Sequence, residues 1–229
     1  MVTSFQEIWA RAADRHGGEE ALQAKLSDKP KSKKALLSIT DDRWLAEMTR
    51  SVFQAGFSWK TIDKKWPGFE EAFEGFEPHR WAFMTDEDLG RLASDARIVR
   101  NGQKIKTVQQ NAAFVVDLIK EHGSASQFFY DWPTTDFVGL LAVLQKRGSR
   151  LGGQTSQYLL RKMGIDGFIL SKDGTAALIA AGVIDKPATS KGALGAVQAA
   201  YNDWMEESGL PLTTISRTLG LSSGDVYLG

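Results

Sequence analysis

The most informative stretch of this chain is glycine-rich and basic: Lys146-Arg147-Gly148-Ser149-Arg150-Leu151-Gly152-Gly153-Gln154-Thr155-Ser156. It separates two segments with helical patterning, at about 136–146 and 154–162. Glycine permits positive φ angles and the close approach of another backbone. The helix that begins near Gln154 would direct unpaired N–H groups outward, where an anion is favoured. We therefore expect two helices joined by a hairpin that can hold an anion.

The turn also carries three cations, and Leu151 is the apolar residue that we expect to anchor it in the core. Arginine and lysine pair well with phosphate. From 146 to 172 there are six basic residues and one acidic residue, Asp166. These are features of a helix-hairpin-helix element, which grips a DNA phosphate without reading the base sequence. An ordinary corner between two helices, with solvated charges, remains the alternative on the residues alone.

Composition limits the other classes of function. The 229 residues are 42% hydrophobic and 24% charged, which is typical of a soluble globular protein. The 28 basic and 28 acidic side chains cancel, so affinity for nucleic acid must come from a local patch. The chain has no cysteine and three histidines, which excludes thiolate chemistry and disfavours a transition-metal site. We expect no metal and no cofactor.

The chain also lacks the signals of secretion or membrane insertion. The sequence becomes polar directly after Met1, and its longest apolar run, 176–184, is far shorter than the roughly 20 residues that span a bilayer. We expect a soluble, cytoplasmic protein with no membrane partner.

Helix signals occur throughout the chain, and no segment alternates like a strand. Thr85 to Asp88 is a capping-box pattern, and residues 102–121 carry one long apolar stripe. A helix that begins at Ser58 is expected to end at Trp66-Pro67-Gly68, because proline breaks helices. The predicted class is therefore all-α. We expect an N-terminal helical segment (1–35), a core (36–185) and C-terminal helices (186–229).

One carboxylate lies at an informative distance from the turn. Asp173 follows an apolar run and comes twenty positions after Gly153. A carboxylate at the start of a helix could stabilise a cationic transition state. The alternative is that Asp173 is simply an N-cap for the helix from Gly174 onward.

Several motifs, taken in order, resemble the DNA-3-methyladenine glycosylase I family over roughly residues 40 to 167. They are Gln54-Ala55-Gly56-Phe57-Ser58-Trp59-Lys60-Thr61-Ile62, Phe69 to Phe76 with Pro78, Met84-Thr85-Asp86-Glu87-Asp88-Leu89, Asp95-Ala96-Arg97-Ile98-Val99-Arg100-Asn101, Lys104-Ile105, Leu144 to Gly148, Gly153-Gln154-Thr155, Tyr158 and Met163-Gly164. The resemblance implies the all-α helix-hairpin-helix superfamily of base-excision glycosylases, which flip a damaged base out of the duplex and cleave its N-glycosidic bond.

The resemblance also implies roles for particular residues. Trp59 would stack on the extruded base, with Gln54 and Ser51 also in the base-binding pocket. Gly56 and Phe57 would form the wedge that enters the DNA. The phosphate-gripping residues would be those of the hairpin: Arg147, Gly148, Arg150, Leu151, Gly152, Gly153, Gln154 and Thr155. An alkylated purine is a flat cation, which an indole face attracts.

The sequence departs from the family in two places. Ser51 stands where the family has a base-reading glutamate, and serine cannot supply a carboxylate. The family's N-terminal segment with cysteine, tyrosine and histidine is not recognisable, so its zinc site is absent. Asp173 instead satisfies the spacing of a catalytic aspartate that many other superfamily members carry.

These observations predict a monofunctional DNA N-glycosylase that removes an alkylated purine such as 3-methyladenine, with Asp173 as its catalytic carboxylate. We expect it to act as a monomer on damaged double-stranded DNA, without zinc. Two alternatives remain: a non-catalytic module that binds damaged DNA, and a helical adaptor for other proteins.

Overall fold

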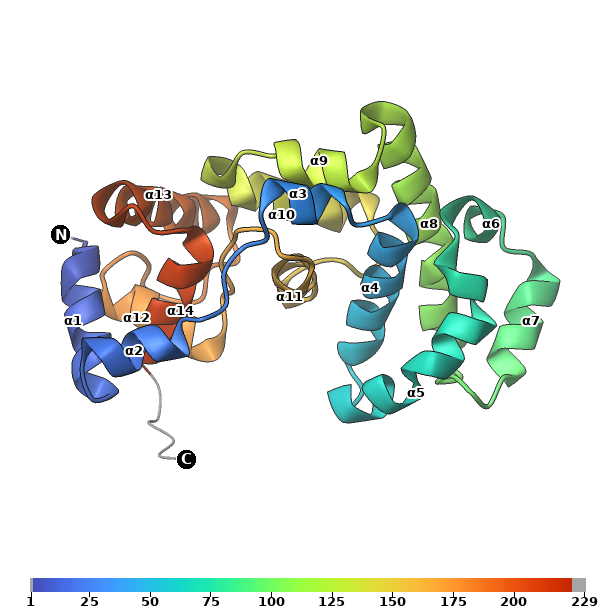
Figure 1. Cartoon of the computed structure of the whole chain (residues 1–229), viewed down its shortest axis with the longest axis horizontal. Helices are drawn as coiled ribbons and strands as arrows, with labels where there is room; N and C mark the ends of the chain where they lie inside the picture. Colours follow the sequence, from blue (N-terminus) through green and yellow to red (C-terminus); the bar gives the residue numbers. More distant parts are fainter. Residues whose placement is uncertain (1, 224–229) are drawn as a thin grey trace. The chain divides into compact units, whose positions relative to one another are not determined.

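The structure, a computed structural model, describes residues 2–223. Every regular element in that range is helical, so the prediction of an all-α fold is confirmed (Figure 1). The helices form two compact units that each combine separate stretches of the chain. The hairpin unit contains residues 32–132 and 141–163, and the terminal unit contains the described residues of 2–31, 133–140 and 164–223. The three consecutive segments expected from the sequence divide the chain differently, and they stay a prediction.

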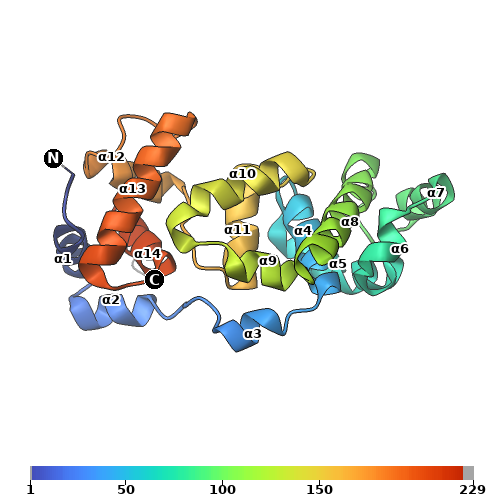
Figure 2. The ribbon, with the colours of Figure 1, turned by 90° about the horizontal axis from the view of Figure 1, so that it is seen from above.

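The hairpin unit is built around one long helix, α8 (Gly102–His122). Helices α4, α6, α7 and α9 all pack against α8. Figures 1 and 2 show α8 next to α4 on one side and next to α6 on the other. The elements of the unit are α3 (Lys33–Leu37), α4 (Asp41–Gln54), α5 (Trp59–Ala72), η1 (Glu74–Phe76), α6 (Pro78–Ala82), α7 (Asp86–Ser94), α8, α9 (Ala125–Asp131), most of α10 (Phe137–Arg147) and α11 (Gln154–Met163).

The terminal unit packs its helices around α14 (Leu212–Ser222), which contacts α1 (Phe5–Arg15), α12 (Lys172–Ala180) and α13 (Lys191–Ser208). It also contains α2 (Glu19–Lys25) and η2 (Thr134–Asp136). Asp166 caps α14 from outside the helix, because its carboxylate accepts the backbone N–H groups of Leu212 and Thr213 at 3.1 and 2.8 Å. Such a carboxylate satisfies orphan donors and complements the positive end of the helix.

Helix α5 continues past the point where the sequence predicted its end. Pro67 lies inside the helix, which runs on to Ala72. The prediction of an end at Trp66-Pro67-Gly68 is therefore wrong. The reason is aromatic packing: the Trp66 ring stacks on Phe69 and on Phe76, at centroid distances of 5.4 and 5.6 Å. Burial of these rings outweighs the hydrogen bond that proline removes.

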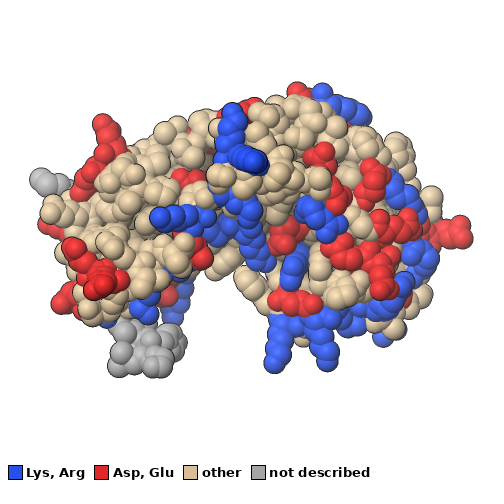
Figure 3. All heavy atoms as spheres, in the orientation of Figure 1, with Lys and Arg blue, Asp and Glu red and all other residues tan. Residues whose placement is uncertain are grey.

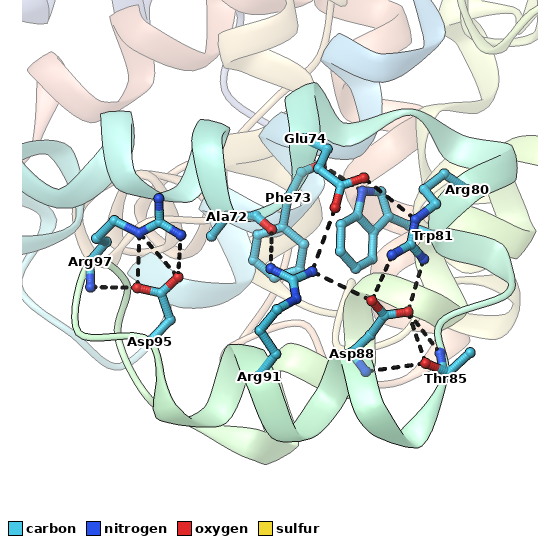
Figure 4. Close-up of polar contacts among 10 residues, drawn as sticks. All are labelled: Ala72, Phe73, Glu74, Arg80, Trp81, Thr85, Asp88, Arg91, Asp95 and Arg97. Carbon is cyan, nitrogen blue, oxygen red and sulfur yellow. Dashed lines mark hydrogen bonds and ion pairs between the residues drawn. The ribbon is translucent and has the colours of Figure 1, made fainter.

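A polar network joins α6 to α7 at the end of this aromatic cluster (Figure 4). The Arg80 guanidinium donates two hydrogen bonds to Asp88, at 2.9 and 2.6 Å, and its carbon lies 4.5 Å from the Trp81 ring centroid. Asp88 also accepts from the Thr85 backbone N–H at 3.1 Å, which completes the capping box that the sequence predicted. The hydrogen bonds from Arg80 hold the pKa of the Asp88 carboxyl well below its usual range.

We expect Asp88→Asn to lower the free energy of unfolding by about 2 kcal/mol at neutral pH, because it weakens charge-assisted hydrogen bonds at a buried position. The native Asp88 has a lowered pKa, so its contribution is fully present above the ordinary carboxyl pKa and is lost as pH falls below about 4. Chemical denaturation across that pH range measures both effects. Glu87→Gln, an exposed change in the same helical turn, is the control; equal losses in the two variants would contradict the prediction.

Candidate active site

The predicted hairpin is present, with its turn between α10 and α11. Leu151 is 1% exposed and anchors the turn in the core, as expected. A Cβ atom at Gly148 would lie 2.6 Å from Leu151 Cδ1 and 2.8 Å from the Leu144 carbonyl oxygen, so only glycine fits there. Gly153 has a φ of +58° directly before the first residue of α11. The glycines therefore serve close packing at one end of the turn and chain reversal at the other.

A buried amide on α8 holds the turn in place. Asn111 is fully buried, and its Oδ1 accepts the backbone N–H of Ser149 at 2.7 Å. Its Nδ2 donates to the Ser149 carbonyl oxygen at 3.2 Å. This pair of bonds satisfies both backbone groups of a turn residue and makes the hairpin part of the rigid core.

The two arginines of the turn differ in their surroundings. Arg147 donates two hydrogen bonds of 2.8 Å to Glu121, and its guanidinium lies over the Phe114 ring. Arg150 is exposed, has a φ of +57° and donates one hydrogen bond to Gln103 at 2.9 Å. A phosphate could reach Arg150 without displacing a carboxylate, whereas Arg147 would have to exchange its ion pair.

A pocket of about 280 Å³ opens beside the hairpin. It is lined by Ser51, Gln54, Ala55, Trp59, Gln154, Thr155, Tyr158 and Lys162. The structure thus brings together the three residues predicted to bind the base and two of those predicted to bind phosphate. They come from α4, α5 and α11, which are elements of one unit.

Trp59 forms an open wall of this pocket. It is the first residue of α5 and is 47% exposed, which is unusual for a large apolar side chain in this protein. The ring of Tyr158 meets the indole edge to face, with 5.6 Å between centroids and a 90° interplanar angle. The indole is therefore held in one orientation while about half of its surface is exposed to solvent.

Gln54 is held from both ends of its amide. Its Nε2 donates to Asp63 Oδ1 at 3.1 Å, and its Oε1 accepts from the Lys162 ammonium. The Lys162 Nζ also lies 4.5 Å from the Trp59 ring centroid and 3.3 Å from Glu47 Oε1. The polar side of the pocket is therefore a connected set of charged and amide groups.

Glu47 and Lys162 were not among the predicted site residues, and Tyr158 was predicted only as a match to the family. A usable signal was present in helical spacing, because residues 47, 51 and 54 share one face of α4, and residues 158 and 162 share one face of α11. Helical spacing does not show that α4 packs against α11 and brings these two faces together.

The predicted wedge follows α4 as a tight loop. Gly56 has a φ of +144°, and Phe57 is half-buried. The buried Lys104 donates to the carbonyl oxygens of Val52 and Ala55, at 2.5 and 3.4 Å, so it caps the negative end of α4 and fixes the loop. Burial lowers the pKa of Lys104, and the positive charge of Arg150 lowers it further.

Asp173 belongs to the terminal unit, so the structure does not place it relative to the pocket. It is exposed in the first turn of α12. The N-cap of that helix is Ser171, whose Oγ accepts the Gly174 N–H at 3.0 Å. The alternative that Asp173 is the N-cap is therefore wrong. Its catalytic role stays a prediction.

A basic hollow of about 810 Å³ lies along α5. Lys60, Lys64 and Lys65 line it together with Glu71 and Arg97, which form an ion pair at 3.0 Å. Figure 3 shows lysine and arginine side chains gathered over this helix. A local patch of this kind is what a protein with no net charge needs to bind a polyanion.

The chain has no cysteine, and the part that the structure describes holds no group of three histidine, aspartate or glutamate residues able to bind a metal. Over the same range, no helix is both long and apolar enough to cross a membrane.

An all-helical chain with a hairpin turn beside an aromatic pocket has the fold that is found in solved DNA glycosylases. The chain belongs to the methyladenine glycosylase family, whose sequence profile matches residues 37–169.

The relatives agree with this assignment. The chain is 40% identical over 74 residues to DNA-3-methyladenine glycosylase 1 of Escherichia coli. These residues make up 32% of this chain and 40% of that enzyme. It is 28% identical over 131 residues to DNA-3-methyladenine glycosylase of Haemophilus influenzae. That match covers 49% of this chain and 71% of that enzyme. The 8-oxoguanine DNA glycosylase of Methanocaldococcus jannaschii shares the fold with a TM-score of 0.56 and 13% identity, over 93% of this chain and 92% of that one.

We expect Asn111→Ala to destabilise the protein by about 1–3 kcal/mol, because it leaves the N–H and C=O groups of Ser149 without their buried partner. Urea denaturation measures the change. Gln109→Ala is the matched control, since Gln109 lies on the same helix and makes a single side-chain hydrogen bond, to the Met84 carbonyl. A loss no larger than that of the control would show that the turn does not depend on Asn111.

Proposed function

We propose that the protein is a DNA-repair N-glycosylase that flips an alkylated purine, such as 3-methyladenine, out of duplex DNA and excises it. The observation that supports this proposal best is the half-exposed Trp59 in a pocket shared with Gln154 and Thr155 of the hairpin. A phosphate on the hairpin and a base on the indole would then be held by neighbouring groups. The relatives' names, which refer to 3-methyladenine, point to the same substrate.

The proposed substrate is a good leaving group, so the pocket needs few catalytic groups. Methylation at a ring nitrogen gives the purine a positive charge, so the bond electrons that it takes on departure neutralise it. Little general acid is then required. The protein must hold the base outside the stack, and it must place negative charge near the sugar as that becomes an oxocarbenium-like cation.

We assign these tasks to separate residues. Trp59 stacks on the extruded base, and Phe57 fills the space that the base leaves in the duplex. Asp173 stabilises the developing sugar cation and accepts a proton from the attacking water. The C1′–N bond to the purine breaks as the water oxygen bonds to C1′. The hairpin backbone, with Arg150, binds a phosphate, and the basic hollow on α5 supports a further part of the DNA backbone.

We further propose that the enzyme works as a monomer on damaged duplex DNA in the cytoplasm, without zinc. The zinc-free part of this proposal rests on the lack of cysteine in the chain. Ser51 in place of a carboxylate makes a DNA-binding protein without catalysis the alternative, and measurement of base release decides between them.

We expect the native protein to release free methylated purine from alkylated genomic DNA. Trp59→Ala should reduce release by roughly a hundredfold or more while leaving the melting temperature nearly unchanged, because the side chain is half-exposed. Asp173→Asn should reduce release by a similar factor. Chromatography of the free bases measures both effects.

Asp185→Asn is the matched control, since it removes another exposed carboxylate from the same unit. Unchanged release in Asp173→Asn would remove that residue from the mechanism. Tight binding of alkylated duplex with no release by the native protein would identify the non-catalytic alternative, and no DNA binding at all would leave the adaptor.

We expect duplex binding to weaken steeply as salt rises, and Arg150→Ala to reduce the slope of log K against log salt by about 0.9, the value for one lost phosphate contact. Fluorescence anisotropy over a salt series measures the slope. Lys120→Ala, an exposed change near the end of α8, should leave it unaltered. The hairpin assignment would be wrong if both variants behaved alike.

A further inference from the structure

The indole face that is to receive the base is already covered by a cation. Lys162 Nζ lies over the Trp59 ring, 4.5 Å from its centroid, within the space that a purine stacked on this face would occupy. A base cannot stack on that face of Trp59 unless the ammonium moves. Because the Lys162 side chain is 27% exposed and flexible, it can swing into solvent when displaced.

The groups around the ammonium form a set that recognises positive charge. The Trp59 ring offers its negative face, Gln54 offers an amide oxygen, and Glu47 offers a carboxylate 3.3 Å away. Gln54 cannot turn its oxygen away without losing its own bond to Asp63. The site is therefore organised for a cation whether or not Lys162 is the cation present.

Glu47 is the charged member of this set, and it is little exposed. Its side chain is 15% exposed and lies one helical turn before Ser51, whose hydroxyl donates to the same carboxylate oxygen at 3.3 Å. If a neutral guest displaced Lys162, this carboxylate would lose its counter-charge in a partly buried place, which is costly. A cationic guest replaces the lost charge. The penalty thus falls on neutral bases alone.

We propose that Glu47 determines specificity for a cationic purine, and that Lys162 is a resident cation that such a purine displaces from Trp59. This inference rests on the proposed function and adds the group that reads the charge of the base. It assigns no chemical step to either residue: Glu47 selects, and Lys162 keeps the pocket closed to neutral bases.

The test uses two small ligands that differ in charge. They are 3,9-dimethyladeninium, a permanent cation, and 9-methyladenine, its neutral counterpart. Calorimetric titration of the full chain gives the affinity for each. We expect the native protein to prefer the cation. Lys162→Met should bind the cation about tenfold more tightly, because a competing occupant is removed. Glu47→Gln, which keeps the shape of the side chain, should lose most of the preference.

Lys120→Met is the control for a general change in charge and should match the native protein. Lys162→Gln repeats the test if the methionine variant is unstable in thermal melting. Weaker cation binding by both Lys162 variants would overturn the inference, since Lys162 would then itself hold the base. An unchanged preference in Glu47→Gln would overturn it as well, and so would a native protein that binds neither ligand.

The failure of this inference is distinct from that of the proposed function. Release of methylated purine from DNA by the native protein, together with an unchanged preference in Glu47→Gln, would refute the role of Glu47 alone. The expected ligand preferences without any release from DNA would refute the proposed catalysis and leave the charge-selective pocket in place.

Discussion

The structure depends above all on how the hairpin turn is fixed to α8. Asn111 satisfies both backbone groups of Ser149, and Gly148 lets Leu151 pack beneath the turn at a distance that no other residue would allow. Buried polar groups are tolerated only when paired, so these contacts define one position for the turn. Gln154 and Thr155 follow directly and line the pocket. The backbone proposed to bind phosphate and the wall proposed to bind the base are thus parts of one packed unit.

The lysine and arginine side chains of the hairpin unit have different surroundings, and this matters more than their number. The chain carries no net charge, yet its cations differ sharply in their surroundings. Lys104 is buried and caps α4, Arg147 is paired with Glu121, and Arg150 is exposed on the turn. Lys162 lies on the indole. Only an exposed cation is readily available to a phosphate, because a paired one must first give up its partner. A count of basic residues therefore overstates the charge that DNA would meet.

Much of the local structure followed from the sequence because its causes are local. The capping box at Thr85 and the long stripe of α8 depend on side chains within a few residues of each other, and both are present. The hairpin with Leu151 at its centre was predicted for the same reason. The end of α5 was misplaced because the packing of Trp66 on Phe69 and Phe76 overrides the local signal of Pro67. Asp173 was weighed as an N-cap, although Ser171 two residues earlier takes that role.

Contiguous residues were enough to predict the all-helical class and the hairpin, and the family resemblance indicated Trp59 as the pocket indole. Which charges share the pocket depends on tertiary packing. Glu47 and Lys162 are more than a hundred residues apart, and their meeting depends on the packing of α4 against α11. Helical periodicity defines the face on which a side chain lies, but not the face that it meets. Sequence motifs were therefore enough to recognise the family, whereas the charged groups of the pocket became known only from the packing of the helices.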